Sequence, residues 1–90
     1  MLIRSQDKTE LINLNNATSI SAIPEYGNKK SIVVKLIGED RWTILGYYSE
    51  EKALKVLDKI ENTYVRFQQR YGSSTSNRDC IYNMPQEDEI

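Results

Sequence analysis

The sequence contains no histidine and a single cysteine, Cys80. Without histidine, the chain lacks the commonest general base and the commonest zinc ligand, so Ser-His-Asp and Cys-His catalytic arrangements are excluded. A lone cysteine leaves no internal disulfide, which is typical of a protein from a reducing compartment. We therefore expect a cytoplasmic protein that is not an enzyme and that holds no cofactor or metal.

Long apolar runs and a strong charge of one sign are also missing. No stretch of about 18 consecutive apolar residues is present, so we expect no membrane-spanning helix. The net charge of −1 provides no general attraction to nucleic acid or to an anionic membrane surface. With 39% hydrophobic and 28% charged residues, the 90 residues have the balance of one globular domain, spanning residues 1–90.

The first half of the chain reads as β-strands joined by turns. Residues 2–6 and 9–14 flank the polar pair Asp7-Lys8, which suggests a hairpin. Three further segments contain many β-branched and aromatic residues and are separated by glycine-containing turns. These segments are residues 18–23, 31–37 and 41–48. We predict an antiparallel meander of four to five strands within residues 1–48.

The hydrophobic period changes after this region. Ser49 is the expected N-cap of a helix, with Glu50 and Glu51 in its first turn, and Gly72 is the expected stop. Apolar residues then recur at spacings of four and three, which places them on one face of an amphipathic helix. They are Ala53, Leu57, Ile60, Tyr64, Phe67 and Tyr71. The fold class is therefore α+β, with a helix over residues 49–72. Residues 73–90 are expected to form a loop, a short edge strand and an acidic tail.

Both faces of the predicted sheet carry apolar side chains. Alternate residues of segment 31–37 point to opposite faces, and both sets contain valine, leucine or isoleucine. One helix covers one face, so the second face exposes an apolar patch unless a loop or the C-terminal segment folds over it. Such a patch is typical of an interface, and we expect a homo-oligomer or a protein partner.

Two arginines near the end of the predicted helix are candidates for binding phosphate. Arg66 and Arg70 lie four residues apart, and two guanidinium groups on one face can hold a phosphate while the neighbouring Tyr71 stacks on a ring. Trp42 and Tyr47 are further stacking candidates, although a tryptophan is most often a core residue. The alternative for the arginines is that the helix dipole alone favours cations at this end.

The polar block near the start of the chain is a second candidate site. Arg4, Gln6 and Asp7 offer a guanidinium, an amide and a carboxylate that together suit a polar ligand. The alternative is a hairpin turn in which the Asp7 side chain bonds the local backbone, and the residue spacing favours this turn.

Three sequence blocks point to a family. "IRSQDK" (residues 3–8), "LGYYSEEKALKVLDKI" (residues 45–60) and "YNMP" (residues 82–85) occur in this order and spacing. In these blocks the chain resembles a group of small uncharacterised phage and prophage proteins of Gram-positive bacteria. The resemblance implies a phage origin and the cytoplasm of a bacterial host, and it brings no catalytic signature.

Small phage proteins of this size often act by binding, and some counter host defence. From this resemblance we expect a protein that sequesters a nucleotide-derived immune signal. Arg66 and Arg70 would hold phosphate, and Trp42, Tyr47 or Tyr71 would stack on rings. Arg4, Gln6 and Asp7 would add polar recognition. The alternative is a protein–protein module that docks a host or phage protein through the exposed sheet face, with no small-molecule ligand.

Overall fold

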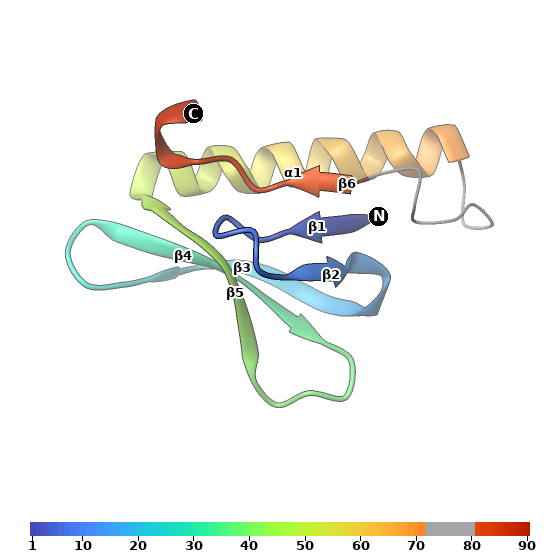
Figure 1. Ribbon diagram of the computed structural model, residues 1–90, viewed down its shortest axis with the longest axis horizontal. Helices are drawn as coiled ribbons and strands as arrows, with labels where there is room; N and C mark the ends of the chain where they lie inside the picture. Colours follow the sequence, from blue (N-terminus) through green and yellow to red (C-terminus); the bar gives the residue numbers. More distant parts are fainter. Residues whose placement is uncertain (72–80) are drawn as a thin grey trace.

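A computed structural model describes residues 1–71 and 81–90, with side chains for residues 1–68 and 81–90. Figure 1 shows one long helix lying across two small sheets, which confirms the α+β composition. The elements are β1 (Leu2–Arg4), β2 (Leu11–Asn13), a 3₁₀ turn (Leu14–Asn16), β3 (Ala17–Pro24), β4 (Lys29–Leu36), β5 (Trp42–Ser49), α1 (Glu50–Tyr71), β6 (Ile81–Asn83) and a second 3₁₀ turn (Glu87–Glu89).

The strands of the described residues form two separate sheets, so the prediction of a single meander of four to five strands is wrong. β3, β4 and β5 form an antiparallel meander of three strands in that order. In the other sheet, β1 lies between β2 and β6, antiparallel to β2 and parallel to β6. The expected hairpin at the start of the chain and the expected short edge strand near its end are both confirmed, but they belong to this second sheet.

The break between the two sheets comes from the asparagine-rich segment after β2. The Asn13 side chain accepts a hydrogen bond from the backbone N–H of Asn15 at 3.0 Å, and Leu14 N–H donates to the Met1 carbonyl at 2.9 Å. These bonds stabilise a 3₁₀ turn that redirects the chain before β3 begins. β2 therefore does not continue into a ladder with β3, and β1 pairs with β2 along one edge and with β6 along the other.

The main core lies between α1 and the inner face of the meander. Ile32 and Val34 of β4 and Leu45 and Tyr48 of β5 are almost completely buried there. Of its predicted apolar stripe the helix buries Ala53, Ile60 and Phe67, and it also buries Val56. Met1 and Ile3 complete this core from the second sheet. The amphipathic period of the helix therefore explains which of its faces is buried.

The C-terminal segment after β6 is tied to the core by several hydrogen bonds. The Tyr48 hydroxyl donates to the Pro85 carbonyl at 2.7 Å, and Met84 N–H donates to the Arg4 carbonyl at 3.0 Å. Glu87 accepts from the backbone N–H of Ser49 at 3.1 Å, so a carboxylate lies at the N-terminus of α1, where the helix dipole favours negative charge. The residues expected to form an acidic tail are therefore partly structural.

Burial of Tyr48 makes the stability of the fold sensitive to alkaline pH. Burial raises the pKa of the Tyr48 hydroxyl, and Tyr82, Glu87 and Glu89 raise it further. The unfolded tyrosine ionises near pH 10.0 while the folded one keeps its proton, so the free energy of unfolding falls as the pH rises above that value. Tyr82, whose pKa is also raised by burial, acts in the same direction.

We expect Tyr48→Phe to lower the free energy of unfolding by about 0.5–1.5 kcal/mol at pH 7, because the bond to Pro85 is lost. Between pH 9 and 11 the variant should lose less stability than the wild type, and urea unfolding at each pH measures this difference. Tyr26→Phe is the matched control, because the Tyr26 side chain is fully exposed. If the free energy of unfolding fell equally with pH in Tyr48→Phe and in the wild type, Tyr48 would not be the source of the pH dependence.

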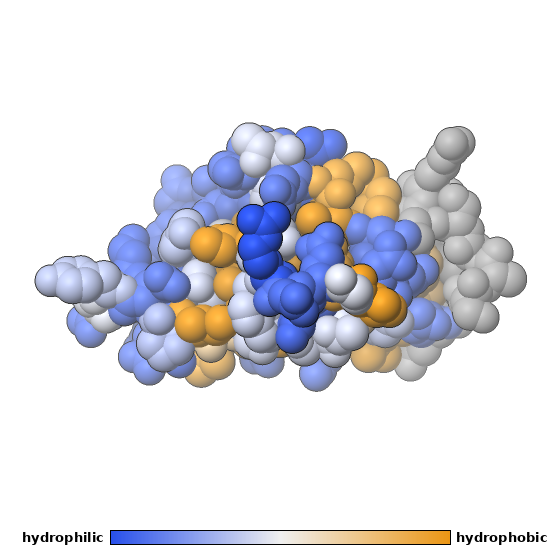
Figure 2. Space-filling view, turned by 90° about the horizontal axis from the view of Figure 1, so that it is seen from below, coloured by the Kyte–Doolittle hydropathy of each residue, from blue (hydrophilic) through white to orange (hydrophobic). Residues whose placement is uncertain are grey.

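The outer face of the meander, which points away from α1, is only partly apolar. Val33 is buried in the middle of this face, whereas Trp42, Ile44 and Tyr47 on β5 remain 42%, 43% and 47% exposed. Viewed from the side opposite the helix, the apolar residues form several patches separated by polar ones (Figure 2). This division gives a docking surface on the sheet face less support than the sequence pattern suggests.

Candidate functional site

The three sequence blocks, residues 3–8, 45–60 and 82–85, meet in space. Gln6 of the first block binds the second through its N–H to the Leu45 carbonyl at 2.7 Å and through its side-chain amide to both main-chain groups of Tyr47. The third block is joined to the second by the bond from Tyr48 to Pro85, and to the first by the β1–β6 ladder. One junction is thus built from residues that are distant in sequence.

A hollow of about 500 Å³ opens at this junction and is the candidate functional site. We call it the β1–β6 hollow. Its lining is Arg4, Lys8, Asn83, Met84, Pro85, Gln86 and Glu89. The volume lies within the range of small-molecule sites, which is roughly 300–1,000 Å³. Arg4 and Lys8 come from the first block, and the other five residues come from the third block and the segment after it.

The polar groups of the β1–β6 hollow suit an anionic ligand with hydroxyl groups. The Arg4 guanidinium donates to the Lys8 carbonyl at 3.1 Å, which holds the arginine beside the loop and leaves its other N–H groups for a ligand. Lys8 adds a second cation, and Asn83 adds a neutral amide. One oxygen of Glu89 accepts from Gln86 N–H at 2.6 Å, and its carboxylate can also accept from a ligand hydroxyl.

The Asp7 side chain stabilises its own loop. One of its oxygens accepts from the Ser5 hydroxyl at 2.7 Å and from the N–H and hydroxyl of Thr9 at 3.0 and 2.7 Å. These bonds, with the Ser5 bond contributing most, lower the pKa of the Asp7 carboxyl below its ordinary value. Lys8 has a positive φ of 67°, as tight turns require. The turn interpretation of this block therefore explains Asp7, while Arg4 and Lys8 on either side of it face the hollow.

The other predicted site residues do not gather around the β1–β6 hollow. Asp7 and Trp42 line a different hollow of about 360 Å³ beside β5, together with Glu10 and Glu39. Three carboxylates against one arginine in that lining disfavour phosphate. Tyr47 is exposed on the outer sheet face, and Gln6 is held by the backbone contacts described above.

The predicted arginine pair lies on α1. Arg66 is exposed and lines none of the hollows named here. Arg70 and Tyr71 belong to the last turn of the helix, and their side chains lie outside the described residues. A site that uses both Arg66 and the β1–β6 hollow would therefore need a second subunit.

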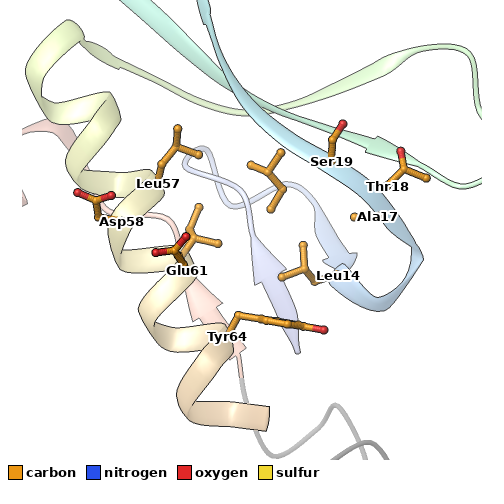
Figure 3. Close-up of a pocket in the computed structure, with 10 residues that line it drawn as sticks. Leu14, Ala17, Thr18, Ser19, Leu57, Asp58, Glu61 and Tyr64 are labelled. Carbon is orange, nitrogen blue, oxygen red and sulfur yellow. The ribbon is translucent and has the colours of Figure 1, made fainter. Parts of the chain in front are cut away.

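A larger opening separates the helix from the edge of the meander. We call it the α1–β3 groove; its volume is about 530 Å³. Leu14, Ala17, Thr18, Ser19 and Ile20 line one side, and Leu57, Asp58, Ile60, Glu61 and Tyr64 line the helix side. In Figure 3, Leu57 and Tyr64 extend from the helix toward β3, with Leu14 between the two elements. Sequence reasoning missed this groove because it depends on which strand lies at the sheet edge.

Comparison with protein-family models, curated proteins and solved structures found no match to this chain. Within residues 1–71 and 81–90, no helix is long and apolar enough to cross a membrane. The same residues contain no cluster of three or more acidic or cysteine side chains that would hold a metal ion.

Proposed function

We propose that this protein is a non-enzymatic binding protein that sequesters a phosphorylated, nucleotide-derived small molecule in the β1–β6 hollow. The observation that carries the proposal is the convergence of Arg4 and Lys8 on a hollow of about 500 Å³ with the amide of Asn83. Arginine and lysine together bind phosphate through charge-assisted hydrogen bonds. The resemblance to small phage proteins makes a signal of host defence the expected ligand.

A second subunit would complete the site. The described residues that line the β1–β6 hollow include no aromatic side chain, so they offer a base in the same ligand no ring to stack on. Exposed aromatic residues elsewhere on the chain, such as Trp42 and Tyr47, would supply that surface from a neighbouring copy. The proposal therefore includes a homo-oligomer with ligands at its subunit boundaries.

Native mass spectrometry after incubation with a mixture of linear and cyclic nucleotides tests this function. We expect an oligomer with a fixed number of nucleotides per subunit. The double variant Arg4→Gln, Lys8→Asn should weaken binding by about 10- to 100-fold, because it removes charge-assisted hydrogen bonds to phosphate. Asparagine is chosen at position 8 because it tolerates the positive φ found there.

The matched control is the double variant Lys55→Gln, Lys59→Gln, which removes two exposed cations of α1 outside the hollow. It should leave the affinity within about twofold of wild type, since neither lysine contacts the proposed ligand. If the Arg4→Gln, Lys8→Asn variant retained nucleotide, or if the control variant lost as much affinity, the β1–β6 hollow would not be the binding site. A protein that retains no nucleotide from the mixture would contradict the function.

A further inference from the structure

We infer that the α1–β3 groove binds an extended segment of a partner protein, which adds to β3 as a further strand and carries basic side chains toward Asp58 and Glu61. This inference does not depend on the proposed function of the β1–β6 hollow. It begins from the position of β3, which is an outer strand of the meander, with β4 on one side and the groove along part of the other.

The free edge of β3 has main-chain groups available for pairing. Glu25 N–H donates to the Lys29 carbonyl at 2.9 Å, and the register continues without a shift from Pro24 to Ser19. Because bonded and non-bonded pairs alternate in an antiparallel ladder, the main-chain groups of Ile20 and Ala22 point away from β4. Among the described residues, no other element makes a backbone hydrogen bond to Ile20 or Ala22.

Two features limit the free edge to a short stretch. The register shifts between Ala17 and Ser19, and the Thr18 hydroxyl donates to the Lys35 carbonyl at 3.1 Å. At the other end, Pro24 has no N–H to offer. An added strand therefore pairs over residues 19–23, and bonds to Ile20 and Ala22 fix its register.

The groove beside this edge accepts side chains of the added strand. Strand addition places alternate side chains of the incoming segment on the inner side of the sheet, where the groove lies. Ile60 is buried, and Leu57 and Tyr64 are partly buried, so an incoming apolar side chain would cover the part of their surface that is still exposed. Main-chain bonds to β3 would thus supply affinity, and the groove would select the side chain.

The charge of the groove selects the occupant. Asp58 and Glu61 are exposed on its helix side, and no basic residue is among the described residues that line it. A second copy that paired antiparallel through β3 would carry its own α1 on the same side of the joined sheet. Asp58 and Glu61 of the two copies would then lie on the same side. Like charges repel, whereas lysine or arginine in a partner segment would pair with the two carboxylates.

Synthetic capped nonapeptides test this inference. In four peptides the side chains on the inner side are alternately lysine and one apolar residue (valine, isoleucine, leucine or phenylalanine), threonine occupies the remaining positions, and glutamate replaces lysine in a matched set. We expect at least one lysine peptide to bind below 1 mM, with amide NMR shifts concentrated in residues 19–23 and 57–64. The matching glutamate peptide should bind at least about tenfold more weakly, and N-methylation of the groups that pair with β3 should abolish binding.

Substitutions in the groove complete the experiment. The double variant Asp58→Asn, Glu61→Gln should weaken binding of the lysine peptide by about three- to tenfold, because two exposed ion pairs are lost. Glu51→Gln, an exposed carboxylate of the same helix outside the groove, should have no effect. Failure of all four lysine peptides at 1 mM, shifts elsewhere, or equal binding of glutamate peptides would overturn the inference. Self-association with shifts in the same residues would overturn it in favour of a second copy.

Discussion

Replacing Met84 with alanine should lower the free energy of unfolding by about 2–5 kcal/mol, the cost of a cavity at a buried methionine. Met84 is 4% exposed and packs in the main core although it belongs to the C-terminal segment. Domains of this size have a total stability on the order of 5–15 kcal/mol, so this loss would remove a large share of it. Chemical denaturation followed by circular dichroism measures the change.

Met84→Leu is the control for this prediction. Leucine nearly conserves the side-chain volume, so the loss should stay below about 1.5 kcal/mol. Both variants keep the backbone bond from residue 84 to the Arg4 carbonyl, and the comparison therefore isolates packing. If Met84→Ala costs no more than Met84→Leu, the C-terminal segment does not contribute to the core.

Gly46→Ala should destabilise the protein by about 1–3 kcal/mol through overpacking. A Cβ at this position would lie 2.9 Å from the Gln6 Cβ and 3.0 Å from the Tyr48 ring. In an ordinary strand, replacing glycine by alanine is favourable because the unfolded chain loses entropy, so the expected sign is the reverse of the usual one. The melting temperature and the free energy of unfolding from urea titration at 25 °C both show whether the substitution destabilises or stabilises the protein.

A double-mutant cycle with Gln6→Gly tests the cause. Removing the Gln6 Cβ relieves the closer of these two contacts, so Gly46→Ala should cost less in the Gln6→Gly background than in the wild type. Equal costs in the two backgrounds would show that the Gln6 contact is not responsible. The close approach matters for the site, because Gln6 joins the first sequence block to β5.

The longest elements could be predicted because their signals are local. The helix, found at Glu50–Tyr71 against a predicted span of 49–72, follows from an apolar period that its own residues carry. The three long strands follow from runs of β-branched residues between glycine turns. Both signals depend only on neighbours in the sequence, so no knowledge of the rest of the fold was needed.

The division into two sheets could not be predicted in this way. β1, β2 and β6 each have three residues, too few for a clear alternation, and Ile3 pairs with Tyr82 across nearly the whole chain. The signal for the break was present in the asparagines after β2, which predict a turn. The sequence does not show that this turn also ends the ladder, because that depends on the direction in which the chain leaves it.

The same limit applies to the candidate sites. The bonds of Asp7 within its loop follow from ordinary turn chemistry. The gathering of Arg4 and Lys8 with Asn83 depends on the parallel β1–β6 pair, and the α1–β3 groove depends on the strand order. The arginine pair on α1 stays a prediction, since the helix dipole explains those cations without a ligand.

The pairing of β1 with β6 also bears on how the chain folds. Contacts within β3, β4 and β5 join neighbouring segments and close short loops, whereas Leu2 meets Ile81 only after most of the chain has been placed. Closing such a long loop costs more entropy than closing a hairpin, so the meander and helix should be ordered first. During synthesis, the small sheet that carries the β1–β6 hollow is therefore the last part to assemble, after residues 81–83 have left the ribosome.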